Sequence, residues 1–232
     1  MNKGNKLLDY AQLLDSSFPG EKAGCSFGSA LPDSNMTVLN KEDRAAWIEQ
    51  QLQRKLIHMD VSAIQAVYAV FPQQDPALIA AIDFRLSRMR SNSTEIQDPE
   101  AKSAGRRMFK LAQVLYPYLN FSQLETSCRL LNSHNTLAVL HGWINAQLGI
   151  ALHDAISGYI TAAVAAQLRS VHSLVNLSQE ERSQLQQQLV RCMHEGWLQA
   201  REESLTRWTS EHILHPRQVA SLPVQPVVTA LR

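Results

Sequence analysis

Apolar residues recur every three or four positions along much of this chain, the spacing that places them on one face of an α-helix. The pattern predicts a first helix that opens at Asn40 and carries Leu52 and Leu56 on its apolar face. We expect Asp60 to restart the chain into a second helix. That helix should end at Pro72, because proline lacks the N–H that a helix interior needs.

Short polar signals mark the starts of further helices. Asp75 and Asp98 each precede a proline, a pair typical of the cap and first position of a helix. Ser178 and Glu181 match a capping box, in which each side chain accepts a hydrogen bond from the other residue's backbone N–H. No segment of useful length alternates apolar and polar residues as a strand would. The sequence therefore predicts an all-α fold, organised as a single-domain helical bundle.

The stretch from residue 130 to residue 168 is almost uncharged, since Asp154 is its only acidic or basic residue. It carries Gly142 and Gly149 seven positions apart, followed by Tyr159. Glycines at that spacing lie on the same side of a helix, where the absent side chains let another backbone approach. We therefore expect these three residues to serve helix packing, either inside the fold or between the subunits of a dimer.

Composition narrows the classes of protein that fit. The chain has 232 residues, of which 45% are hydrophobic, so it can bury a sizeable core. Its 22 basic and 21 acidic residues nearly cancel, and nucleic-acid binding is disfavoured. Three widely spaced cysteines, Cys25, Cys128 and Cys192, are typical of reduced thiols. The N-terminus lacks the apolar stretch of a signal peptide, so we predict a cytoplasmic protein without a membrane span.

Candidate chemistry is sparse. The sequence holds no Gly-x-Ser-x-Gly elbow and no Gly-rich phosphate loop, so we predict no catalytic residues and no enzyme activity. Histidine and cysteine are ligands that suit nickel. The pairs His134 with His141 and His212 with His215, and also Cys25, are nevertheless more simply structural or surface residues. We predict no metal site within the chain and no stably bound cofactor.

Several of these segments together resemble the UreF family of urease accessory proteins. Residues 12–19 read QLLDSSFP, and Ser26 and Gly28 follow. The two glycines and the tyrosine of the uncharged stretch match the next part of the family pattern, and Leu174, Leu177 and Gln179 match its closing motif. The likeness covers most of residues 7–190. Ser173, Asn176 and Ser178 depart from the family pattern, so the chain is identified as a divergent member.

The resemblance implies a function as well as a fold. UreF proteins are all-helical dimers that bind the partner UreD, called UreH in some organisms, and the GTPase UreG. That complex delivers nickel to apo-urease, and UreF acts in it as a scaffold and as a regulator of the GTPase. The implied partners are therefore a UreD-type protein, a UreG-type GTPase, apo-urease and a second copy of the chain, while nickel is handled by the complex.

The resemblance also suggests which parts of the chain meet partners. The loop residues chosen for partner binding are Asp15, Phe18, Pro19, Ser26 and Gly28. Proline and glycine fix the backbone of such a loop, and Phe18 can anchor it. Packing of the N-terminus onto the bundle is an equally good explanation of the motif. Residues 1–214 are assigned to the all-α domain, and residues 215–232, which contain three prolines, to an extended or partner-ordered tail.

Two other classes of protein fit the same residues. An all-α interaction or regulatory module unrelated to urease would have the same composition and helices. A helical metalloenzyme would need histidine and acidic side chains from several helices to converge on one metal ion. Binding to UreD and UreG would separate the first alternative from a urease accessory protein, and the three-dimensional arrangement of the ligands would test the second.

Overall fold

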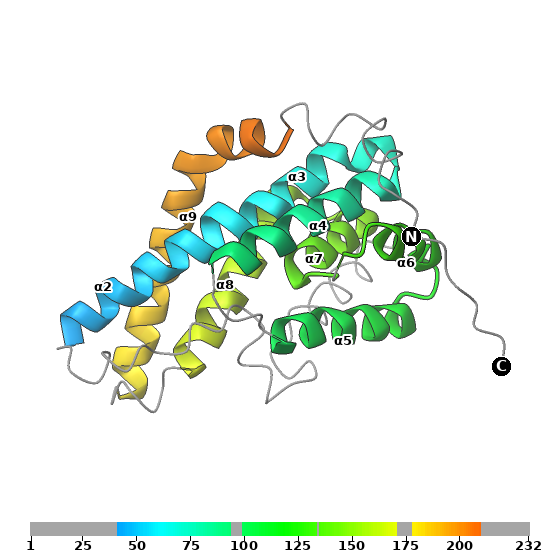
Figure 1. Ribbon diagram of the computed structural model, residues 1–232. Coiled ribbons are helices and arrows are strands. Elements are labelled where there is room, and N and C mark those ends of the chain that lie inside the picture. The colour runs from blue at the N-terminus through cyan, green and yellow to red at the C-terminus, as the bar shows by residue number, and fades with distance from the viewer. Residues whose placement is uncertain (1–40, 94–98, 134, 171–177, 210–232) are drawn as a thin grey trace.

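The computed structural model describes residues 41–93, 99–133, 135–170 and 178–209, and Figure 1 shows how their helices are arranged. In chain order the helices are α2 Lys41–Leu52, η3 Gln53–Val61, α3 Ser62–Val70, η4 Phe71–Gln73, α4 Pro76–Ser93, α5 Pro99–Leu115, α6 Phe121–Leu130, α7 Leu137–Leu148, α8 Leu152–Ser170 and α9 Gln179–Thr209. No strand occurs in the described ranges. The predicted all-α fold is confirmed.

The segments α2, η3 and α3 form one continuous rod, coloured from blue to cyan in Figure 1. The middle segment η3 is a π-helix, and the residues before each junction, Leu52 and Val61, both have helical backbone angles, with φ at −64°. The prediction that Asp60 restarts the chain is therefore wrong. Its carboxylate does not cap a helix, because Arg90 and Tyr159 bind it from two other helices.

The predicted helix caps at Asp75 and Ser178 are confirmed by their hydrogen bonds. The backbone N–H of Ala77 donates to Asp75 Oδ1 at 2.8 Å, which satisfies one free donor at the start of α4. At the start of α9, the Ser178 N–H donates to Glu181 Oε2 at 2.8 Å, and the Glu181 N–H donates to Ser178 Oγ at 3.2 Å. This is the reciprocal capping box that the spacing predicts. Asp98, before α5, lies outside the described residues.

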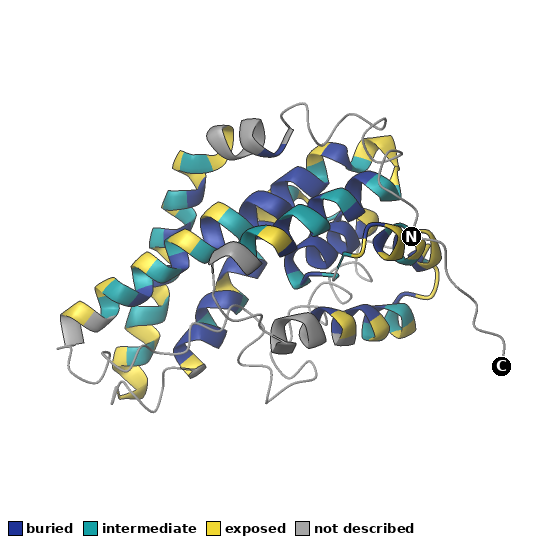
Figure 2. Cartoon of the chain, in the orientation of Figure 1, coloured by how far each residue is buried: buried dark blue, intermediate teal, exposed yellow. Residues whose placement is uncertain are grey.

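Helices α3 and α7 lie at the centre of the bundle, where α4, α8 and α9 also contact α3. Figure 2 shows this centre as the most continuous dark-blue region. Every residue of α7 from Ala138 to Ala146 is buried. Burial on all sides explains the low charge of the stretch around α7, because a charged side chain there would lose its hydration. Among the described helices, none is both long enough and apolar enough to cross a membrane.

The two glycines of the uncharged stretch have different roles. A Cβ placed on Gly142 would lie 3.3 Å from Ile64 Cα and 3.4 Å from Val67 Cβ, so its missing side chain lets α7 approach α3 closely. The prediction that Gly149 also packs helices is wrong. Gly149 is exposed, and it ends α7 with φ at 68° and its N–H donating to the Ala146 carbonyl. Glycine fits this left-handed cap because it has no Cβ.

Candidate functional site

A buried ion pair joins the central helices at the end of η3. Arg90 Nη2 of α4 donates to Asp60 Oδ1 at 2.6 Å, and Tyr159 Oη of α8 donates to Asp60 Oδ2 at 3.0 Å. Only 4% of Asp60 and 1% of Tyr159 are exposed. We call these three residues the Asp60 centre. It binds together η3, α4 and α8.

The π-helix is part of this arrangement. Its last turn contains Asp60, and the hydroxyl of Ser62 donates to the carbonyl of Ile57 at 2.9 Å. π-Helices are rare, and they occur frequently at functional sites. The wider helix therefore coincides with the position at which a carboxylate is held in the core.

The protonation states of the Asp60 centre follow from its surroundings. Burial alone would lower the pKa of Arg90, but the charge of Asp60 and the hydrogen bond to it outweigh burial, and the pKa of Arg90 is raised. Burial first, and then the nearby Asp60 charge, raise the pKa of Tyr159 well above its usual value. Arg90 is therefore positive and Tyr159 is a neutral donor at physiological pH. Charges held in this way fix the relative positions of helices.

His141 lies beside this centre and is engaged within the fold. Its ring centroid is 5.0 Å from that of Tyr159, and its Nε2 lies 2.9 Å from the carbonyl oxygen of Ala155. A carbonyl only accepts hydrogen bonds, so Nε2 carries the proton. Burial lowers the pKa of His141 to about 4, although the hydrogen bond to Ala155 opposes this effect. The histidine is therefore neutral and structural, in line with the simpler of its two predicted roles. Its partner in the predicted pair, His134, lies outside the described residues.

Asp83 forms a second buried carboxylate site, which the sequence analysis missed. Its two oxygens accept hydrogen bonds from the N–H of Asn135 at 2.8 Å, the N–H of Thr136 at 2.6 Å and the Thr136 hydroxyl at 2.5 Å. These donors lie at the start of α7, so a carboxylate from α4 caps a helix more than fifty residues further along the chain. No local motif signals such a cap, because the acceptor and the donors are far apart in sequence.

The cysteines give little support to metal or nucleophilic chemistry. Burial is the main reason that the pKa of Cys128 rises to about 11. Burial and the hydrogen bond that Cys192 Sγ donates to Glu49 Oε1 likewise raise the pKa of Cys192 to about 11. A thiol that stays protonated is a poor nucleophile and a poor metal ligand. Within the part of the chain that the structure describes, no three His, Cys, Asp or Glu residues form a group suited to a metal ion.

A small aromatic cluster lies between the start of α8 and the middle of α9. The rings of His153 and His194 stack with centroids 6.2 Å apart, and Trp197 lies 5.7 Å from the first and 6.3 Å from the second. Desolvation, and then the neighbouring His153, lower the pKa of His194. The cluster joins α8 to α9, and it was not foreseen because its residues are about forty positions apart.

The predicted partner-binding loop is not among the residues that the structure describes. Asp15, Phe18, Pro19, Ser26 and Gly28 all fall in residues 1–40. The same holds for Cys25, for the histidine pair His212 and His215, and for the boundary proposed at residue 214. Of the predicted helix-packing residues, Gly142 and Tyr159 lie in the core and Gly149 does not.

The described part of the chain defines a class of protein, an all-helical bundle in which two buried carboxylates, Asp60 and Asp83, link helices that are far apart in sequence. The UreF family model matches residues 38–190, which is more than half of the chain, and the chain belongs to the UreF family. A urease accessory protein UreF of Bacillus sp. strain TB-90 is 21% identical over 192 residues, and that of Lachnoclostridium phytofermentans is 22% identical over 193. Each comparison covers 83% of this chain and 84% of the relative.

Proposed function

We propose that this protein is a urease accessory protein, a scaffold and regulator in a complex with a UreD-type (UreH) protein and a UreG-type GTPase. The complex inserts nickel into apo-urease. The match of the UreF family model over residues 38–190 is the observation that carries this proposal. Two relatives of similar length, both urease accessory proteins UreF, support it.

A scaffold works by holding partner surfaces in a fixed relation to one another. The Asp60 centre supports such a role, because a buried ion pair with directional hydrogen bonds links η3, α4 and α8 in one geometry. The proposed effect on the GTPase is thermodynamic. A bound protein shifts a switch only by the difference in its affinity for the two states. The chain would therefore bind one nucleotide state of the UreG-type partner more tightly than the other.

In this proposal nickel is the cargo of the complex, and the chain itself holds no resident cofactor and catalyses no reaction of its own. The protein acts in the cytoplasm as a homodimer. The N-terminal loop remains our choice for the contact with partners, through Asp15, Phe18, Pro19, Ser26 and Gly28. Pro19 and Gly28 would set the course of the loop, and Phe18 would supply its anchor.

Reconstitution tests the proposal. Binding would be measured by mixing the purified full-length protein with the UreD-type and UreG-type proteins that are encoded with the same urease. In a separate experiment, urease activation would be measured in nickel-fed cells that produce the protein. We expect complex formation and activation with the wild type, and no hydrolysis of urea or GTP by the chain alone. Failure to bind either partner in any order of addition would refute the proposed function. Phe18→Asp should stay folded and lose partner binding. If this variant still supported full urease activation, the loop would not be part of the partner interface.

A further inference from the structure

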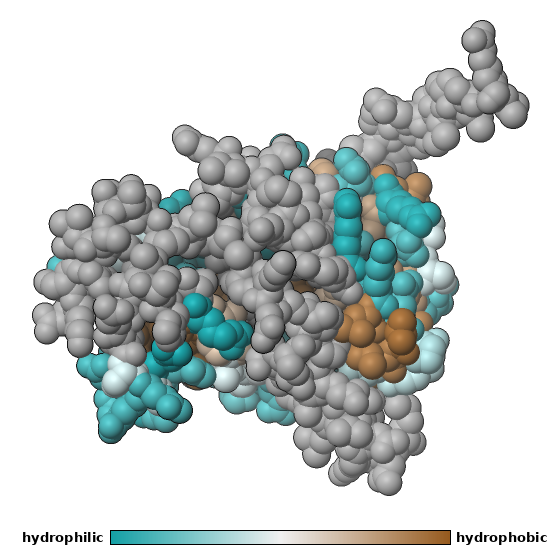
Figure 3. All heavy atoms as spheres, turned by 90° about the horizontal axis from the view of Figure 1, so that it is seen from below, coloured by the Kyte–Doolittle hydropathy of each residue, from teal (hydrophilic) through white to brown (hydrophobic). Residues whose placement is uncertain are grey.

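Helix α5 carries an apolar strip on a side that the rest of the described chain leaves largely uncovered. The strip consists of Leu111, Val114, Leu115 and Tyr118, at positions i, i+3, i+4 and i+7. Val114 is 75% exposed and Tyr118, in the turn after the helix, is 56% exposed, while the two leucines are half-buried. Figure 3 shows a brown patch among teal residues on the lower face, where α5 lies in Figure 1.

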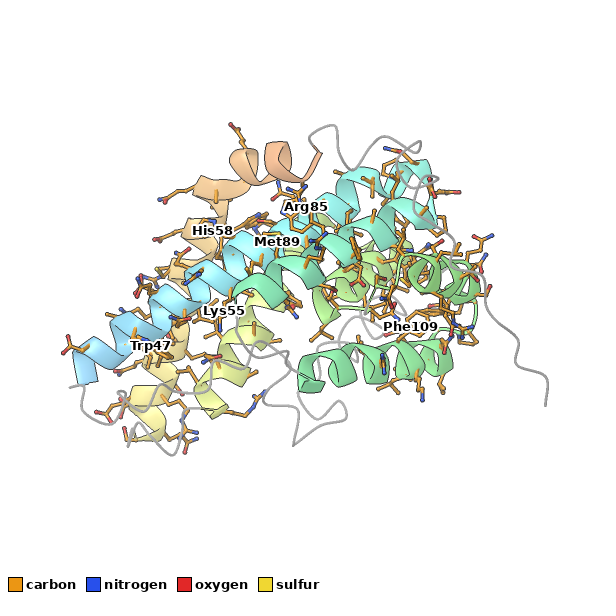
Figure 4. The ribbon with its side chains drawn as sticks, viewed as in Figure 1. Trp47, Lys55, His58, Arg85, Met89 and Phe109 are labelled. Atoms are coloured by element: carbon orange, nitrogen blue, oxygen red, sulfur yellow. The ribbon has the colours of Figure 1, made fainter. Side chains whose placement is uncertain are left out.

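The inner face of α5 already has its partners. Met108, Phe109 and Ala112 are buried, and the Phe109 ring meets the Phe121 ring edge-on with centroids 5.4 Å apart. Figure 4 shows Phe109 on the side of α5 that faces the other helices. Leu115 still packs partly against the core, and the Tyr118 ring meets the buried Tyr116 ring edge-on with centroids 6.3 Å apart. Val114, at the middle of the strip, is the residue most exposed to solvent. The spacing of the strip is the one that places apolar side chains against a second helix.

The charge next to the strip is basic. Residues 101–124 contain four basic residues and no acidic residue, and Glu100 and Glu125 flank this segment. Arg106 and Lys110 from this segment are exposed and lie about two turns and about one turn, respectively, before Val114 on α5. An apolar strip bordered by cations favours a partner surface that is apolar at its centre and acidic at its edge.

We propose that this α5 strip docks an amphipathic helix of a partner protein, with apolar residues against Val114 and acidic residues beside Arg106 and Lys110. The proposal rests on the proposed function only in taking that partner from the urease-maturation complex. A second copy of the chain is a poorer occupant. A two-fold contact of the strip with itself would bring two basic segments together without acidic residues between them.

The test compares Val114→Asp with Leu198→Asp, a matched control because Leu198 is also an exposed apolar residue, at 50%, on α9. A third variant, Arg106→Glu with Lys110→Glu, reverses the charge beside the strip. Thermal melts first establish that each full-length variant is folded. Affinity for the UreD-type and UreG-type partners is then measured at low and raised salt, and the oligomeric state is measured by light scattering. A synthetic helical peptide with leucines at i, i+3, i+4 and i+7 and glutamates beside them serves as a partner-free probe.

We expect Val114→Asp to weaken one partner, and the peptide, at least about tenfold, while Leu198→Asp stays close to the wild type. The charge reversal should weaken the same partner and reduce the salt dependence. If Val114→Asp bound the partners and the peptide as tightly as the wild type does, the proposal would be overturned. It would also be overturned if Val114→Asp lost self-association but kept partner binding, because the strip would then dock a second copy of the chain. If the wild type bound neither partner, the proposed function would fail. Binding of the peptide to the wild type and not to Val114→Asp would still show that the strip docks an amphipathic helix, and absence of peptide binding would refute that as well.

Discussion

Removal of the Asp60 carboxylate tests whether the buried ion pair holds the bundle together. Asp60→Ala removes the carboxylate that accepts hydrogen bonds from Arg90 and Tyr159. Breaking a buried pair typically costs about 3–5 kcal/mol, because the remaining charge is buried and uncompensated. The Arg90 side chain keeps 23% of its surface accessible, so water can partly hydrate it, and we expect the lower end, about 3 kcal/mol. That is a large share of a typical domain stability of about 5–15 kcal/mol.

A double-mutant cycle separates the pair from its surroundings. Arg90→Met alone should also destabilise the protein, but by less, since Tyr159 still donates to Asp60. The combination of Asp60→Ala with Arg90→Met closes the cycle and should recover part of the loss, because neither charge of the pair is then left buried on its own. Tyr159→Phe removes one hydrogen bond to a charged acceptor and should cost about 1.5–3 kcal/mol.

Urea unfolding followed by circular dichroism gives the free energy of each variant. If the ion pair stabilises the bundle, positions 60 and 90 are coupled favourably. The double variant then loses less stability than the sum of the losses in the two single variants. If both single variants lost under about 1 kcal/mol and their effects simply added, the pair would not hold η3 against α4. The described contacts of Asp60 would then be incidental to stability.

Three further predictions concern single positions. Gly142→Leu should lower the free energy of unfolding by about 3 kcal/mol or more, because the new side chain would meet the α3 backbone. Gly149→Ala should lower it by only about 1 kcal/mol, because alanine is strained at a positive φ. Thermal melts compare the two variants. The pKa of His141 is about 4 in the folded state, so between about pH 6.5 and pH 4 only the unfolded chain protonates this histidine. The free energy of unfolding should therefore fall by about 1.4 kcal/mol per pH unit as the pH drops through this range. A His141→Phe variant should lack this part of the pH dependence. Asp83→Ala should cost about 2 kcal/mol and speed hydrogen exchange at the Thr136 amide; unchanged exchange would show that the carboxylate is not the cap of α7.

The elements that could be predicted are those whose signals are local. Asp75 and Ser178 cap helices that begin within three residues of them, so a short stretch of sequence contains both the donor and the acceptor. The error at Asp60 has the opposite cause. An acidic residue before an apolar run has the sequence pattern of a cap, but here its partners are thirty and ninety-nine residues away. No local sequence pattern indicates such long-range partners. Asp60 was therefore predicted to start a helix, whereas it lies inside the continuous helical segment of α2, η3 and α3.

The glycines illustrate the same limit for packing. Gly142 and Gly149 lie on one side of a helix only if the helix continues through both, and α7 ends at Leu148. The spacing argument therefore fails, and the close approach at Gly142 comes from its own position on α7 opposite Ile64 and Val67. The family motif near the N-terminus, in contrast, could be recognised but not tested, because residues 1–40 lie outside the described structure. Recognition of the family and assignment of its contact residues are separate inferences.

The Asp60 centre and the α5 strip should be separable by experiment, because they are distinct parts of the bundle. The centre is internal and links η3, α4 and α8, so substitutions there act on the free energy of unfolding. The strip lies on the exposed side of α5, so Val114→Asp removes little internal contact and should leave stability nearly unchanged. A scaffold needs both properties, a rigid interior and surfaces free for partners. If Val114→Asp instead lowered stability as much as Asp60→Ala, the exposed side of α5 would be part of the folded core and not a docking surface.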